Sequence, residues 1–339
     1  MRRVSTFMLI VLSMLTPVRG GVEWQGAPAA SQNSDGQPAL AAQDERLLAL
    51  LPPADLVGVV DLPSLLVDLL PRLDKLGVKG ASSLAAELNR IATALGIEPK
   101  QLRRAVFSIT LESFAASGLV LIEGADPDQK KVEGLLKGYQ VEYRSLVHDG
   151  VTILTLASPP QAPALGPLSI NTSDISYASL GEGRIVIGEL SRVRQAIERR
   201  LKPAPPAGVQ ATALREANPA SMIRFAFILS PEMREAASSQ GDLFKSIAAV
   251  SVLVGDLGVG ADLALSLNAV MRTPTTRDAQ ELEQGLKGLV NLGRVLLASG
   301  DPNLTAIINQ VRISVKDRDV ALKIALPSSF IEQMSSKKS

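Results

Sequence analysis

The chain has 339 residues, of which 46% are hydrophobic and 20% are charged. This balance excludes a disordered chain and predicts a sizeable core, in two domains or one large one. The 35 basic and 34 acidic residues nearly cancel and only 3% of residues are aromatic, which argues against nucleic acid as a partner. Because the chain has no cysteine, disulfides, thiol catalysis, thiolate metal ligands and a lipid-modified N-terminal cysteine are excluded.

Residues 1–20 have the pattern of a secretory signal peptide. Arg2 and Arg3 supply a positive start, residues 7–15 form a short apolar core, and residues 18–20 offer small residues for cleavage. This core is too short for an uncleaved anchor, since a membrane-spanning helix needs about 20 residues. We therefore expect a periplasmic or secreted protein, with no transmembrane helix in the mature chain.

A flexible linker is expected at residues 21–43, which are rich in Ala, Gly, Gln, Ser and Pro and show no period. The first half of the folded part, residues 44–201, then opens with a strand and a helix. Residues 56–60 are apolar and partly β-branched, which suits a buried strand. Asp61 can cap the amphipathic helix that follows.

The rest of the first half alternates between helices and paired strands. Three helices are predicted here. One spans residues 82–95, one starts after Asp126 as its capping residue, and one spans residues 191–201 with Ser191 as its cap. Strands are predicted at 105–111, 118–123, 140–146, 151–156, 175–180 and 184–188. Asp149 and Gly150 indicate a tight hairpin, because both turn residues need positive φ.

Residues 202–211, a proline-rich linker, form the best internal boundary. The second half, residues 212–334, repeats the element order of the first more loosely. It is predicted to contain strands at 222–229, 248–253, 261–271, 311–315 and 320–326, helices from 230 and at 278–297, and a short turn at 330–334. This order predicts an α+β fold made of two related halves of mostly antiparallel sheet with helices packed on one face.

Residues 246–267 are long and apolar enough to resemble a membrane span. Asp256 and Asp262 lie inside the segment, however, and a charge at the centre of a bilayer is costly. The glycines of 255–260 instead predict a turn between two strands. This loop lacks the G-x-G-x-x-G order, and no helix follows it to receive a phosphate.

His148, the one histidine, is a candidate catalytic base. A Ser-His-Asp site needs the base between a nucleophile and an orienting acid, whereas His148 lies beside a polar hairpin turn, which favours an exposed turn residue. A zinc site would have to consist mostly of carboxylates, which is an uncommon ligand set. No nucleophile motif has a fitting context. The sequence therefore assigns no catalytic, cofactor-binding or metal-binding residue.

Two pairs of acids were weighed as acid/base or calcium sites. Asp126 and Asp128 flank a proline, and Asp317 and Asp319 flank an arginine. Neither pair completes the calcium-loop pattern. Helix capping explains the first pair, and turn chemistry explains the second.

The helix at residues 191–201 is basic and has only a narrow apolar face. An anionic partner, such as a lipid head group or a polyanion, is one interpretation, and a solvated helix face is the other. The four basic residues are Arg192, Arg194, Arg199 and Arg200.

Two segments carry a family resemblance. The stretch LLPPADLVGVVDLPSLL resembles a pattern common at the start of uncharacterised bacterial exported proteins, and ISYASLGEGRIVIGELSRVRQAIERRL resembles a later hairpin and helix of the same proteins. The resemblance implies an extracytoplasmic α+β protein of unknown function, often with duplicated units. It supplies no catalytic residues.

The leading expectation is a non-enzymatic exported envelope protein that acts by binding or scaffolding, with another envelope protein as its partner. The alternative is a carrier of an apolar or amphipathic ligand, held between curved sheets and leucine-rich helices. A hydrolase that uses carboxylates or serine is the third interpretation. An enclosed apolar cavity would favour the carrier, whereas clustered buried carboxylates with perturbed titration would favour the enzyme.

Overall fold

The structure is a computed structural model, and it describes residues 37–71, 81–112, 115–157, 169–170, 174–202, 212–238, 246–260, 264–297 and 307–327. The expected signal segment 1–20 and the expected last turn 330–334 lie outside the described residues. The chain divides into two compact units. The main parts of unit 1 are Ala41–Asp74 and Lys79–Ala211, and the main part of unit 2 is Thr212–Ser339.

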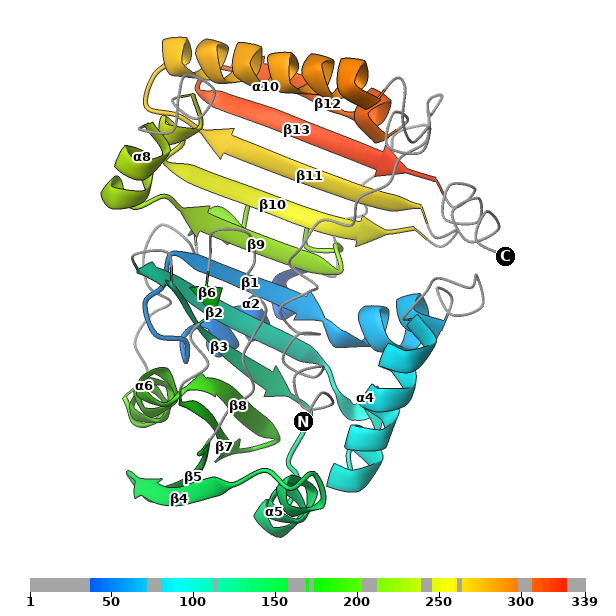
Figure 1. The fold of residues 1–339 in the computed structure, drawn as a ribbon, viewed down its shortest axis with the longest axis vertical. Coiled ribbons are helices and arrows are strands. Elements are labelled where there is room, and N and C mark those ends of the chain that lie inside the picture. The colour runs from blue at the N-terminus through cyan, green and yellow to red at the C-terminus, as the bar shows by residue number, and fades with distance from the viewer. Residues whose placement is uncertain are drawn as a thin grey trace. The chain divides into compact units, whose positions relative to one another are not determined.

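Unit 1 contains a mostly antiparallel sheet with the strand order β1-β2-β3-β8-β7-β5-β4 (Figure 1). The strands are β1 (Leu56–Asp61), β2 (Arg104–Glu112), β3 (Ala115–Glu123), β4 (Tyr143–His148), β5 (Val151–Leu156), β7 (Ile175–Gly181) and β8 (Arg184–Glu189). The short β6 (Ser169–Ile170) pairs with β3 in parallel. The predicted hairpin turn between β4 and β5 is confirmed, because Asp149 and Gly150 have φ values of 47° and 74°.

The helical segments of unit 1 lie before, between and after these strands. They are α2 (Gln37–Leu48), the π-helical η1 (Ser64–Leu69), α4 (Ala81–Leu95), the 3-10 turn η2 (Pro99–Gln101), α5 (Gln129–Gly138) and α6 (Leu190–Leu201). Helix α2 begins inside the range 21–43 that was expected to be flexible linker. Its C-terminal end is anchored, since Leu47 and Leu48 are buried.

Two of the predicted helix starts are wrong by a few residues. The cap of α5 is Asp128, whose carboxylate accepts a hydrogen bond from the backbone N–H of Lys130, while Asp126 accepts one from Ser179 instead. Helix α6 begins at Leu190, directly after β8, and not after a capping Ser191. The side chain of Asp126 therefore contacts the sheet, at Ser179, and does not cap the helix.

Side chains alternate between the two faces of the unit 1 sheet, as the strand register requires. One face, here called the packed face, carries Val106, Leu119, Leu121, Ile153, Ala178 and Val186. The opposite face, here called the cavity face, carries Ile122, Leu154, Ile175, Tyr177, Ile185 and Ile187. The two sets are equally apolar, apart from Tyr177.

Helices cover both faces of this sheet. Helix α6 packs on β3, β7 and β8, and Arg192 of α6 donates hydrogen bonds to Ser108 and Thr110, whose side chains belong to the packed face. Helices α4 and α5 lie over the cavity face. The α+β class is confirmed, but the arrangement in unit 1 differs from the one covered face that the sequence predicted.

Unit 2 contains an antiparallel sheet with the order β9-β10-β11-β13-β12 (Figure 1). The strands are β9 (Ile223–Ile228), β10 (Val252–Val259), β11 (Leu265–Arg272), β12 (Arg312–Lys316) and β13 (Asp319–Leu326). Its two longer described helices are α8 (Pro231–Ser238) and α10 (Thr276–Leu297). Helix α10 packs on β12 and β13, where Ala279 and Leu282 form a core with Val320.

The predicted glycine turn at residues 255–260 is wrong, because most of this segment belongs to strand β10. Gly255 lies under the ring of Phe225, and a Cβ atom there would stand 2.3 Å from Phe225 Cζ. Asp256 is buried and accepts hydrogen bonds from Ser221 and Asn268. The glycine thus serves close packing against an aromatic ring rather than a turn.

The two units pair their strands in a comparable order. If β7 and β8 are set aside, the order β1-β2-β3-β5-β4 in unit 1 corresponds to β9-β10-β11-β13-β12 in unit 2. Asp149 and Asp317 occupy the tight turns of the corresponding hairpins, and both have positive φ. Among the helices of the described ranges, none combines the length and apolar character needed to span a membrane.

Candidate functional site

Unit 1 contains a cavity of about 290 Å³ between the cavity face of the sheet and helices α4 and α5. Its volume is at the lower end of the range of about 300–1,000 Å³ that is typical of small-molecule sites. The described side chains that line it are mostly Leu, Ile and Val. Such a wall offers a ligand van der Waals contacts and burial of apolar surface, but few hydrogen bonds.

The floor of the cavity is formed by four strands. The register aligns Ile187 of β8 with Tyr177 of β7, and Tyr177 with Leu154 of β5, so that these side chains form a row on one face. Ile122 of β3 and Ile185 of β8 form a neighbouring pair. A strand-to-strand row of branched side chains gives a rigid floor.

The roof consists of α4 and α5, together with residues that follow η1. On α4 the apolar positions Leu88, Ile91, Ala92 and Leu95 recur at the spacing of one helix face, and all four line the cavity. On α5 the lining positions are Val132, Leu135 and Leu136. The amphipathic pattern that normally buries a helix on a sheet here faces the hollow.

Polar contacts join α4 to the end of α5. The hydroxyl of Tyr139 donates a hydrogen bond of 3.0 Å to Glu87 Oε1, and Arg90 Nη2 donates one of 2.6 Å to the same oxygen. Arg90 Nε donates to the other carboxylate oxygen at 3.0 Å, and its guanidinium stands 4.5 Å from the centre of the Tyr139 ring. Glu87 and Tyr139 both line the cavity, so this cluster closes one end of the roof.

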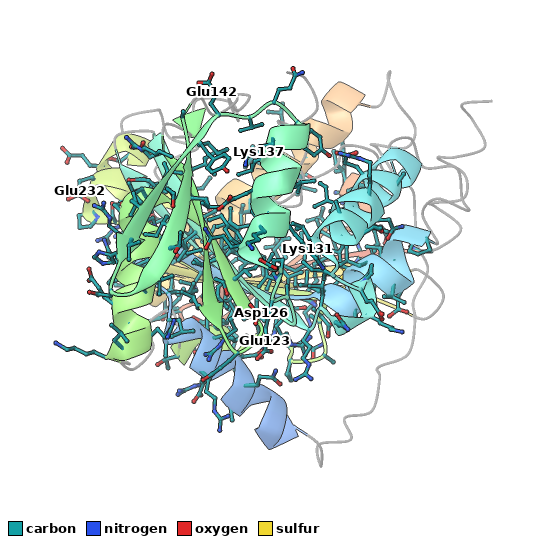
Figure 2. The ribbon with its side chains drawn as sticks, turned by 90° about the horizontal axis from the view of Figure 1, so that it is seen from below. Glu123, Asp126, Lys131, Lys137, Glu142 and Glu232 are labelled. Carbon is teal, nitrogen blue, oxygen red and sulfur yellow. The ribbon has the colours of Figure 1, made fainter. Side chains whose placement is uncertain are left out.

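A second contact joins the opposite ends of the two helices. Lys131 of α5 lies against Gly96, just after α4, where a Cβ atom would stand 2.4 Å from Lys131 Nζ. A cation at this place is favourable, because the C-terminal end of a helix carries a partial negative charge. Figure 2 shows Lys131 and Lys137 near the two ends of α5. The two contacts align α4 and α5 antiparallel to each other.

Tyr177 is a polar residue on the cavity face of the floor. Its hydroxyl is buried and has no hydrogen-bond partner among the described residues. Burial raises the pKa of Tyr177 well above its usual value, and the negative charge of Asp126 raises it further. The residue is therefore neutral at every physiological pH.

His148 lies outside the cavity. Its Nε2 is 3.1 Å from Glu198 Oε1, on the exposed side of α6, and 3.8 Å from Asp149 Oδ2. The contact joins β4 to α6 and includes no nucleophile.

The paired acids do not form joint sites. Asp126 and Asp128 are used by Ser179 and the α5 cap, as described above, while Asp319 accepts a hydrogen bond from Arg272 and Asp317 occupies a turn. Asp319 and Glu216 hold the pKa of Arg272 above its usual value. In the described ranges, no three histidine or acidic residues gather in a way that could hold a metal ion.

The basic helix α6 is less exposed than either interpretation of it assumed. Arg192 is buried and also donates a hydrogen bond to the carbonyl oxygen of Pro53, and Arg199 donates one to the carbonyl oxygen of Ala49. Arg194 and Arg200 are exposed. At least two of the four arginines therefore hold the fold together.

Sequence reasoning missed the cluster of Glu87, Arg90 and Tyr139. The signal was present in part, since Glu87 and Arg90 are three residues apart and therefore share a face of α4. Tyr139 follows the end of α5, and its approach to α4 depends on how the two helices align in three dimensions.

No protein-family model matches this chain, and no curated protein matches it either. Similar solved structures include three crystal forms of TP0453. Form III has a TM-score of 0.47 and 9% identity, over 86% of this chain and 98% of that chain. Forms I and IV both have TM-scores of 0.44, with 9% and 10% identity, over 87% and 88% of this chain and 98% of each of those chains. These scores are too low to assign a function.

Proposed function

We propose that this is an exported, non-enzymatic protein that binds an apolar or amphipathic ligand in the cavity of unit 1. The observation that carries the proposal is the cavity itself, which is lined mainly by aliphatic side chains and roofed by two helices that contact each other. Filling such a hollow with an apolar chain removes apolar surface from water, at about 25 cal/mol per Å². This favours the carrier over the scaffold interpretation.

A hydrolase would need reactive groups that converge on a cleft. The buried Asp256 of unit 2 is instead saturated by Ser221, Asn268 and the backbone N–H of Asn218. The pKa of Glu232 is lowered by hydrogen bonds from its own backbone and from Ser230, at the exposed start of α8. Neither feature favours a catalytic site.

Mass spectrometry tests whether the protein carries a bound ligand. The protein is purified from the periplasmic fraction of an expressing bacterium and extracted with organic solvent, and the extract is analysed. We expect a defined apolar species at close to one equivalent. Leu136→Trp should abolish its recovery, because the larger ring fills the cavity. Leu292→Trp, at an exposed position of α10, is the matched control and should leave recovery unchanged. Equal recovery of the apolar species from both variants would contradict the proposal.

The proposal that the protein is exported is based on Arg2, Arg3 and the apolar core at residues 7–15. N-terminal sequencing of the mature protein should start between about residues 20 and 32, where the small-residue sites fall. A cytosolic protein that retains Met1 would contradict it.

We also propose that the two units derive from one duplicated unit, into which β7, β8 and α6 were inserted in unit 1. The shared strand order and the positive φ of Asp149 and Asp317 support this. An experimental structure tests it by superposition of β1, β2, β3 and β5 on β9, β10, β11 and β13. Strands that superpose only with a reversed direction or a changed order would contradict the duplication.

A further inference from the structure

The wall of the unit 1 cavity contains a carboxylate. Of the described lining residues, Glu87 is the one that carries a charge, while the polar Asn89, Tyr139, Ser176 and Tyr177 are uncharged. The Glu87 side chain is 20% exposed, so solvent screens its charge only in part. The one charged group on an otherwise aliphatic lining is therefore an acid, and its ion pair with Arg90 leaves no surplus positive charge there.

The nearest cation is already engaged. Arg90 uses two of its nitrogens to bind the two oxygens of Glu87, and its guanidinium also lies on the ring of Tyr139. Arg90 has further N–H groups on Nη1, but an anionic ligand that used them would share the cation with Glu87, so the ion pair offers the ligand no uncompensated positive charge.

We propose that the cavity selects an uncharged long-chain compound, such as an ester or an alcohol, over an anionic amphiphile of the same chain length, and that Glu87 determines this selectivity. The inference rests on the proposed binding function. An anionic head group brought to the roof would be repelled by the carboxylate of Glu87, and Arg90, which is already shared with that carboxylate, would offset only part of the cost of the lost hydration. A neutral ester meets no such repulsion, and its chain gains the same burial.

The floor of the cavity has the same preference. Tyr177 offers a neutral hydroxyl, and Asp126 acts electrostatically on that hydroxyl, since it contributes to the raised pKa of Tyr177. A carboxylate placed beside Tyr177 would lie near a second negative charge, because Asp126 accepts a hydrogen bond from Ser179 on the same face of β7. The described lining residues of the roof and of the floor therefore offer an anion no positive charge.

The test compares methyl dodecanoate with dodecanoate, measured by displacement of a fluorescent alkyl probe from the purified full chain at about pH 8, where carboxylates are ionised. We expect the ester to bind roughly tenfold more tightly, as one unfavourable charge contact predicts. Equal affinities, or a preference for dodecanoate, would overturn the inference while leaving the binding function in place. Failure of both compounds to bind would overturn the binding function.

Glu87→Gln is the decisive variant, because the amide keeps an acceptor for Tyr139 and releases Arg90. The affinity for dodecanoate should rise until the roughly tenfold difference disappears, and the affinity for the ester should not change. Glu133→Gln removes a carboxylate from α5 that pairs with Gln129 and does not line the cavity, so it should leave both affinities unchanged. The ester-to-acid ratio of the unmodified chain remains a test if Glu87→Gln fails to fold.

Discussion

The two faces of the unit 1 sheet are built from the same strands and similar side chains, yet one is filled and the other encloses a hollow. On the packed face, Leu121, Ile153 and Ala178 are almost inaccessible to solvent, and α6 meets them with Val193 and Ala196. On the cavity face, Ile122, Tyr177 and Ile187 remain partly accessible, although α4 and α5 lie above them.

The difference lies in how the helices reach the sheet. Helix α6 follows β8 without a loop, is held to β2 by the hydrogen bond from Arg192 to Ser108, and buries its Ala196 fully. Helices α4 and α5 are held to each other by Glu87, Tyr139 and Lys131. An apolar helix face that rests on a sheet stabilises the fold, whereas the same pattern held above the sheet leaves a hollow.

A matched pair of substitutions tests the comparison most strongly. Ile153→Ala removes a fully buried side chain from the packed face. We expect it to lower the free energy of unfolding by about 3 kcal/mol, because close packing leaves the new void unfilled. Urea unfolding followed by circular dichroism measures the loss. A cost below about 1 kcal/mol would mean that the packed face is not tightly filled.

Ile187→Ala makes the same change on the cavity face. The ligand-free protein should lose only about 1 kcal/mol, since Ile187 already borders a hollow and loses fewer contacts. Binding of methyl dodecanoate should weaken at the same time. If Ile187→Ala cost as much as Ile153→Ala, the two faces would not differ in packing.

Tyr177→Phe sharpens the comparison within the cavity face. Removing a buried hydroxyl that has no partner should stabilise the protein by up to about 1 kcal/mol. The pKa of Tyr177 is raised in the folded state, so the unfolded chain ionises first: folding stability is unaffected by this group below the unfolded pKa of about 10 and falls as the pH rises above it. The native chain should lose stability above about pH 10, and the variant less. Identical pH profiles would contradict this.

His148→Asn should have the smallest effect. The ring contacts exposed carboxylates beside a hairpin turn, and asparagine suits the same turn. We expect a change in stability below about 0.5 kcal/mol and unchanged ligand binding. A tenfold loss of binding in a stably folded variant would give His148 a role that its position does not predict.

Periodicity was enough to predict much of the fold. The hairpin at Asp149 and Gly150 and the apolar face of α4 follow from local spacing alone, and so does the α+β class. The segment at Gly255 was misread, because a glycine placed under the ring of Phe225 has the same local signature as a glycine in a turn.

The candidate site could not be predicted in this way. The sequence pattern of an apolar stripe is the same whether the stripe contacts a sheet or borders a hollow. The positions of Leu88 and Ile187 in the sequence therefore do not predict a cavity. The contact between Glu87 and Tyr139 joins residues 52 positions apart, and no local pattern contains it.

The central claim is that a ligand enters between the cavity face and its roof. Methyl NMR of isoleucine-labelled protein during titration with methyl dodecanoate tests it directly. We expect saturable shifts at Ile122, Ile185 and Ile187, and little change at Ile153 on the packed face or at Ile223 in unit 2. Shifts at Ile153 and Ile223 with none at the cavity-face isoleucines would contradict the account.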